Sequence, residues 1–262
     1  MRQRRNVTLL AAGAVLACLA GSAAWAQEPA VPTKDDAKAR QLLQEASGRR
    51  YRWDKNLKGF IADFALTRDD KVVKGSVTVK LTGMRGDIQV TCDDDSAKRA
   101  VREVLGNTVL HTRATTFDDS FGKSSFALAG PGKAGGTVIK LTGHGFFTDF
   151  TVKDGFIVQN HGGAGGFKSE VNVHQVAWVA ELGKTVPKES SATIITGSGD
   201  DAVTRKIHTW EDWGAAQGYV FPTRHRAVMT VGEKKTESLL VLDNIKVERA
   251  PEEEKRQKKR EE

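Results

Sequence analysis

The sequence predicts a single α+β domain, in which an antiparallel sheet of about ten strands carries two helices early in the chain. Apolar and polar residues alternate in most segments from residue 60 to residue 248, as expected for strands with one buried face. The period changes to that of a helix in only two stretches, within residues 34–53 and 92–111. No fixed-period repeat and no interior linker divide the chain, so one domain over residues 35–250 is expected.

Residues 1–26 have the pattern of a secretory signal. MRQRR is a basic start, an apolar run follows, and Ala24-Trp25-Ala26 is a small-x-small cleavage site before Gln27. The apolar run is about 15 residues, shorter than the ~20 that a membrane-spanning helix needs. Val15-Leu16-Ala17-Cys18 also loosely fits a lipoprotein signal, which leaves lipidation of Cys18 open. We therefore expect an exported, periplasmic or extracellular protein.

The expected mature chain has an ordinary soluble surface. The net charge of the full chain is +7, and removing Arg2, Arg4 and Arg5 leaves +4 with signs interspersed, which is not a nucleic-acid footprint. Cys92 would be the only thiol, so a core and not a disulfide must hold the fold. Residues 27–34 form a polar leader, and the charged tail 251–262 is expected to be disordered.

Two helices and several hairpins can be placed. Ala39, Leu42, Leu43 and Ala46 have helical spacing after an acidic start, and Asp93–Ser96 are expected to cap a second helix. Asp154-Gly155 predicts a tight hairpin turn that sets Val152 opposite Ile157. Cys92 is expected to point inward. Further strands are expected at residues 170–182, 191–196, 202–210, 219–231 and 236–248.

The stretch QNHGGAGGFKSE, residues 159–170, looks at first like a phosphate-binding loop. Phe167 separates Gly166 from Lys168, however, whereas a Walker loop needs the lysine directly after the last glycine and a helix after it. The segment that follows is β-branched and alternating, so no helix N-terminus is expected to bind phosphate. We interpret the glycines as a connection between two strands.

Candidate catalytic groups are few. FDDSFGK offers Asp118 and Asp119, which with His111 would suit a hydrolase if the three side chains met in one cleft. A capped, solvated turn is the simpler interpretation. The six histidines are scattered singly, so neither a metal site nor a cofactor is expected, although a site assembled across strands stays open. The tryptophans and phenylalanines are expected to fill the core or to line a cavity for an apolar ligand.

The stretch ARQLLQEASGRRYRWDKNLKGFIADF, residues 39–64, resembles a family of uncharacterised proteins, domain of unknown function 3386. The resemblance spans residues 36–248, and RYRWD is its most specific element. Many relatives lack an export signal, and the family name carries no activity. The resemblance implies candidate site residues in two groups, of which all but His111 and Asp118 are candidate ligand contacts. They are Arg50, Tyr51, Trp53 and Asp54, and then His111, Arg113, Asp118 and Lys123.

A more distant likeness is to periplasmic lipoprotein-carrier proteins, and it implies a curved antiparallel sheet, an open half-barrel, with helices on its concave face. We therefore expect a non-catalytic binding or carrier module for an apolar, lipid-like or amphipathic ligand. The alternatives are a hydrolase that uses the His/Asp cluster, and a structural or protein-interaction domain. Oligomeric state and ligand identity stay open, because fold alone does not fix function.

Overall fold

The computed structural model describes residues 35–133 and 135–250. The expected signal peptide (1–26), leader (27–34) and tail (251–262) lie outside these residues. The described chain forms one antiparallel sheet of twelve strands in the order β3-β2-β1-β12-β11-β10-β9-β8-β7-β6-β5-β4, together with three α-helices. The α+β class is confirmed, whereas the expected numbers of strands and helices were too low. Within the described residues no helix is long and apolar enough to span a bilayer.

The helices are α1 (Ala37–Arg49), α2 (Asp95–Thr112) and α3 (Phe117–Phe121), and two single-turn 3-10 helices are η1 (Ala180–Leu182) and η2 (Gly199–Asp201). The strands are β1 (Leu57–Arg68), β2 (Lys71–Lys80), β3 (Asp87–Thr91), β4 (Ser125–Pro131), β5 (Thr137–Thr142), β6 (Phe147–Lys153), β7 (Phe156–Ala164), β8 (Phe167–Val179), β9 (Lys184–Thr196), β10 (Val203–Ala216), β11 (Tyr219–Val231) and β12 (Lys234–Arg249).

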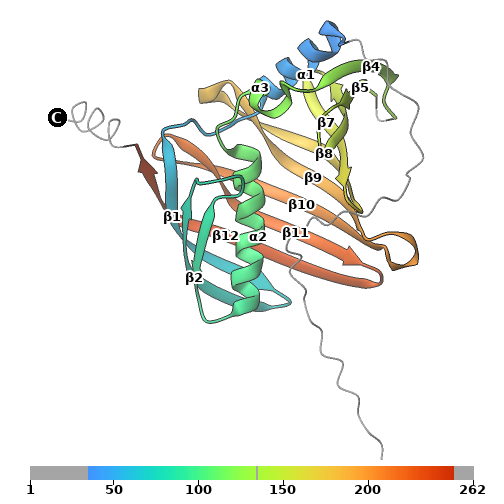
Figure 1. Ribbon diagram of the computed structural model, residues 1–262. Helices are drawn as coiled ribbons and strands as arrows, with labels where there is room; N and C mark the ends of the chain where they lie inside the picture. The colour runs from blue at the N-terminus through green and yellow to red at the C-terminus, as the bar shows by residue number, and fades with distance from the viewer. Residues whose placement is uncertain (1–34, 134, 251–262) are drawn as a thin grey trace, which may run out of the picture. The chain divides into compact units, whose positions relative to one another are not determined.

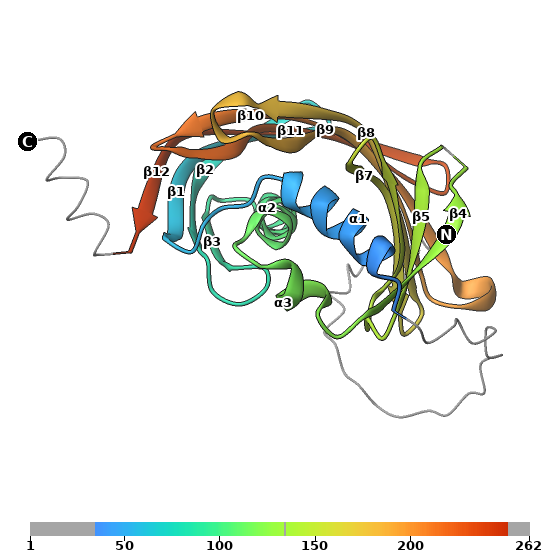
Figure 2. The same ribbon diagram turned by 90° about the horizontal axis from the view of Figure 1, so that it is seen from above.

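The sheet is curved, and all three α-helices lie on its concave side, which we call the inner side (Figures 1 and 2). Strands β3 and β4 end the sheet and do not pair with each other, so the sheet is not closed. Consecutive strands are neighbours almost throughout. The exception is the step from β3 to β4, which lie at opposite edges of the sheet. Strand β12 pairs with β1 as well as with β11, and so joins the N-terminal strands to the C-terminal ones.

Local sequence signals place the turns and helix starts. Asp154 and Gly155 both have positive φ, and Val152 pairs with Ile157, which confirms the predicted hairpin between β6 and β7. Asp94 caps α2 by accepting hydrogen bonds from the Ser96 and Ala97 amides, so the acidic cluster is a cap as expected. The glycine-rich stretch connects β7 directly to β8, and no helix follows it.

Two hydrophobic cores fill the inner side. The first lies between α2 and strands β1, β2, β3, β11 and β12, and Phe60, Val79, Val101 and Phe221 are among its most buried members. Cys92 packs against this core, as predicted. The second core joins α1 and α3 to β4–β7 through side chains such as Leu43, Phe126, Ile139 and Phe150. Helix α2 thus packs over the β1–β3 end of the sheet, whereas α1 and α3 pack over the β4–β7 end.

Candidate functional site

The middle of the inner side carries aliphatic side chains that belong to neither of the two hydrophobic cores of the described chain. Cross-strand partners point to the same side of a sheet, so the register identifies them. One row runs from buried Phe150 through Asn160, Val171 and Ala192 to Ile207 and Met229. The adjacent rows contribute two more apolar positions. We call the resulting set the apolar strip: Val171, Val173, Ala192, Ile194, Ile207 and Met229.

The apolar strip is half exposed. Five of its six side chains are partly accessible to water, and Met229 is 36% exposed. Helix α1 packs mainly on β4, β6 and β7, and α2 packs mainly on β3. None of the strip residues belongs to either core cluster of the described chain. An amphipathic sheet therefore keeps an apolar inner area that the described helices leave open.

The outer side of the same strands is polar and internally paired. His161 Nδ1 lies 2.5 Å from Asp149 Oδ1, and Gln159 donates to the Asn172 side chain at 2.9 Å. Further along, His208 Nε2 lies 2.7 Å from Glu189 Oε1. His174, His208 and Trp210 stack across the strands, and the Arg226 guanidinium lies 4.7 Å from the centre of the Trp210 ring. These polar groups of the outer side thus have partners within the sheet.

The RYRWD element, residues 50–54, anchors the start of β11. The Tyr51 hydroxyl accepts a hydrogen bond from the Val220 amide at 3.0 Å, and the Trp53 indole donates to the Val220 carbonyl at 3.0 Å. Strand β11 pairs with β12 only from Arg224 onward, so these two side chains replace the missing ladder partner of Val220. Asp54 accepts from the Tyr219 hydroxyl and from the Asn56 amide.

Trp53 is 1% exposed and Tyr51 is 7% exposed, so both serve the core. The same element also places two arginines differently. Burial, reinforced by the neighbouring Arg52 charge, lowers the pKa of Arg50 to about 10, while Glu211 acts in the opposite direction. Burial and the charge of Arg113 also lower the pKa of Arg52. Among the described residues, neither guanidinium has a hydrogen-bond acceptor, although both are half buried.

His111 lies beside these arginines in the last turn of α2. Desolvation, followed by the charges of Arg50, Arg52 and Arg85, lowers its pKa to about 4. Its side chain nevertheless remains exposed to water. Water that reaches the side chain screens its charge. Protein that surrounds the ring at larger distance disfavours the charged form and so lowers the pKa. We call Arg50, Arg52, His111 and Arg113 the basic cluster.

Glu211 and His225 lie between the basic cluster and the apolar strip. They are cross-strand partners on β10 and β11, and His225 is also the partner of core residue Leu240, which places both on the inner side. Glu211 Oε1 lies 3.0 Å from His225 Nδ1, and each side chain is about 15% exposed. The negative charge of Glu211 offsets part of the lowering of the Arg50 pKa. The basic cluster therefore lies near Glu211. Thr209, two residues before Glu211 on β10, belongs to the next row of inner side chains.

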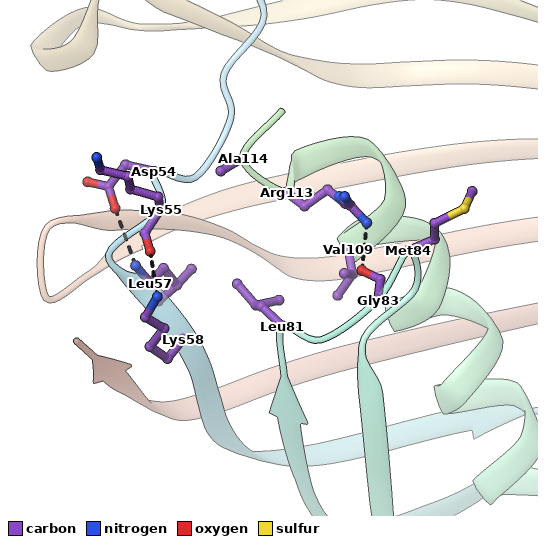
Figure 3. Close-up of a pocket in the computed structure, with 10 residues that line it drawn as sticks. All are labelled: Asp54, Lys55, Leu57, Lys58, Leu81, Gly83, Met84, Val109, Arg113 and Ala114. Atoms are coloured by element: carbon purple, nitrogen blue, oxygen red, sulfur yellow. Dashed lines mark hydrogen bonds between the residues drawn. The ribbon is translucent and has the colours of Figure 1, made fainter. Parts of the chain in front are cut away.

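A pocket of about 340 Å³ opens at the C-terminal end of α2 (Figure 3). Leu57, Leu81 and Val109 give it apolar walls, while Lys55, Lys58 and Arg113 bring positive charge. Arg113 donates to the Gly83 carbonyl at 2.5 Å across this pocket. Arg113 also influences the pKa of Arg52, so the pocket adjoins the basic cluster.

The remaining sequence-derived candidates lie on and around α3. The capping box of this helix uses Asp119, whose carboxylate accepts from the Thr116 amide at 3.0 Å. Asp118 and Lys123 are exposed. Among the described residues no hydrogen bond joins His111 to either aspartate. The simpler interpretation of FDDSFGK, a capped turn, is thus the local structure observed, in the form of one short helix.

In the described part of the chain, no group of three or more His, Cys, Asp or Glu side chains is arranged to hold a metal ion. The aromatic residues belong mostly to the two cores, while Trp210 lies on the outer side and Trp178 is 60% exposed. The open inner area is thus lined by the aliphatic side chains of the strip, with polar neighbours such as Ser190 and Thr209, whose hydroxyl groups are hydrogen-bonded to each other. Sequence alternation could have found these residues, but it gave no sign of which ones a helix would leave uncovered.

The folded region corresponds to a family that has no assigned activity. The family described as "Protein of unknown function (DUF3386)" matches residues 34–247, so the chain belongs to this family. No curated protein matches.

Two solved structures are similar over 82% of this chain and 100% of theirs, each with 11% identity. They are MucB in complex with MucA(peri), with a TM-score of 0.21, and the Pseudomonas aeruginosa MucA/MucB complex, with a TM-score of 0.20. At these scores the likeness supports no inference about this chain.

Proposed function

We propose that the protein is an exported, non-catalytic binding or carrier module for an amphipathic ligand, which it holds on the inner side of the sheet. Export rests on the signal-like pattern of residues 1–26. The periplasm or the extracellular space is the compartment in which the ligand would be met.

The observation that supports binding is the contrast between the two sides of β8–β11. The inner side presents half-exposed aliphatic residues between two helix-covered cores, while the outer side is polar and paired. Apolar surface that a chain leaves open at a concave position is typical of a ligand or partner site. An acyl chain is a suitable ligand, because its binding would remove apolar surface of both the chain and the strip from water.

The His/Asp hydrolase hypothesis has less support. Asp119 is used as a helix cap and Asp118 is exposed, and among the described residues neither is hydrogen-bonded or ion-paired to His111. No specific observation favours catalysis over binding.

Two measurements test the proposal. Native mass spectrometry and lipid extraction of protein purified from its own compartment should reveal a bound amphiphile. Titration of delipidated protein with oleate, 1-oleoyl-lysophosphatidate and mono-olein should show saturable binding of at least one of them. Protein that carries no extractable amphiphile and binds none of the three probes would refute the carrier role.

A matched pair of variants locates the site. Ala192→Trp adds bulk to the apolar strip and should reduce binding at least about tenfold, because an indole occupies the space of the chain. Thr193→Trp alters the next residue of β9, which points to the outer side, and should bind as the parent does. Equal binding by both variants would place the ligand elsewhere.

A further inference from the structure

We propose that the basic cluster binds the anionic head group of the ligand, so that the protein selects anionic over neutral amphiphiles. This inference rests on the proposed function and adds the chemistry of the ligand's polar end. The head group is a carboxylate or a phosphate ester, and Arg50 and Arg52 are the residues expected to contact it.

The first reason is positive charge that the fold does not compensate. The charge of Arg52 acts on Arg50, the charge of Arg113 acts on Arg52, and the charges of Arg50 and Arg52 both act on His111. Glu211 acts on Arg50 in the opposite direction, but it is already hydrogen-bonded to His225, and Asp119, which interacts with Arg113, is used in the cap of α3. Like charges on partly buried guanidinium groups repel one another, and solvent offsets this repulsion less than it does at an open surface. An anion that supplies two acceptor oxygens would relieve the repulsion and satisfy the donors.

The second reason is position. Arg50 is the C-cap residue of α1, and its backbone bridges to Thr185 at the start of β9. The cluster lies near Glu211, which is the cross-strand partner of His225. The next inner row is Thr209 with Ala227, and the row after it is Ile207 with Met229, which belong to the apolar strip. A molecule with one anionic end and one aliphatic chain would match this order of surfaces.

Helix capping explains only part of the cluster. Cations at a helix C-terminus interact favourably with the helix dipole, and Arg113 does cap α2 while donating to Gly83. Arg50 also sits at a helix end, but its guanidinium has no acceptor among the described residues. Arg52 lies beyond both helices. These two side chains therefore remain available to a ligand.

The experiment compares three probes with the same oleoyl chain. Oleate carries a carboxylate, 1-oleoyl-lysophosphatidate carries a phosphate and mono-olein is neutral. Delipidated parent protein should bind one or both anionic probes at least about tenfold more tightly than mono-olein, as expected for one or more charge-assisted hydrogen bonds. The preferred anion identifies the head group.

Arg50→Met and Arg52→Met should each remove most of that preference while leaving mono-olein binding unchanged. Arg50→Lys keeps the charge but loses the planar fork, so an intermediate loss is expected. Lys206→Gln is the matched control, because it removes one exposed positive charge on the outer side of β10. If Arg50→Met does not fold, Arg52→Met still decides the question.

A second readout separates contact from general destabilisation. Bound anion should raise the pKa of His111, measured by NMR titration with and without oleate, while mono-olein should leave it unchanged. Equal affinity of the parent for all three probes would overturn the head-group inference and leave the carrier role intact. Absence of binding by all three would overturn both.

Discussion

Ile139 and Ile207 both point to the inner side of the sheet, but they lie in different surroundings. Ile139 is 0% exposed in the core that α1 and α3 complete. Ile207 is half exposed on the apolar strip, and neither core cluster of the described chain includes it. The same residue type on the same face therefore stabilises the fold in one region and, by our proposal, binds a ligand in the other. Helix coverage and not sequence alternation makes the difference.

The largest expected effect lies in the covered region. Phe221 is 0% exposed and packs its ring 5.0 Å from Phe60 and 5.5 Å from Trp53, centre to centre. Phe221→Ala should lower the free energy of unfolding by about 3–5 kcal/mol, because a large cavity opens in a core that cannot collapse fully. Urea unfolding followed by tryptophan fluorescence measures it. A loss below about 1 kcal/mol would mean that this core is loosely packed.

The comparison of the two isoleucines can be tested directly. Ile139→Ala should cost about 2–5 kcal/mol, as is usual for a fully buried aliphatic side chain. Ile207→Ala in ligand-free protein should cost about 1 kcal/mol or less, because water already reaches the side chain. Unfolding of both variants in parallel gives the difference. Equal losses would show that the strip is covered in solution, and the site would then need another location.

Much of this arrangement follows from local sequence rules. Asp154-Gly155 fixed the pairing of Val152 with Ile157, and the acids before residue 96 marked the cap of α2. Short strands such as β3, with five residues, contain too few alternations to count reliably from sequence. Strand β9 begins at Lys184, earlier than the expected start at residue 191. Pro187 is compatible with this earlier start, because β9 pairs with β10 only from Glu189 onward and the proline needs no hydrogen-bond partner there.

The candidate site was less predictable. RYRWD was singled out by resemblance, but the sequence could not separate Tyr51 and Trp53, which hold Val220, from Arg50 and Arg52, which have no acceptor among the described residues. That division depends on β11 leaving β12 at Arg224, a non-local event. The apolar strip depends in the same way on where α1 and α2 end, since alternation alone marks a face without saying what covers it.

A smaller effect is expected where RYRWD joins β11. Trp53→Phe keeps an aromatic ring but removes the indole donor, so the buried Val220 carbonyl loses its partner. The expected loss of unfolding free energy is about 1–3 kcal/mol. Thermal and urea unfolding measure it, and Trp210→Phe on the outer side is the control, with little change expected. Normal stability of Trp53→Phe would mean that water replaces the indole.

The smallest effect concerns pH and the basic cluster. The pKa of His111 is about 4 in the folded chain, below its ordinary value of 6.5. Desolvation by the surrounding protein is the largest cause, and the positive charges of Arg50, Arg52 and Arg85 lower the pKa further. Between these two values the unfolded chain binds the proton more readily. His111 therefore contributes full stability above pH ~6.5 and progressively loses that contribution as the pH falls toward ~4. Since the ring is exposed, solvent screens its interaction with the arginines and keeps the effect modest.

His111→Asn should accordingly flatten the dependence of stability on pH in that window, while the decline below pH 4, which carboxylates such as Glu170 cause, should persist. Urea midpoints of the parent and the variant at intervals from pH 8 to about 4 isolate the histidine by difference. Saturating oleate should reduce the difference between the two proteins, because a bound anion would offset the arginine charges that disfavour the imidazolium. A pH dependence that is identical in parent and variant would show that the arginines do not act on His111 in solution, and the charge imbalance behind the head-group proposal would be smaller than the geometry indicates.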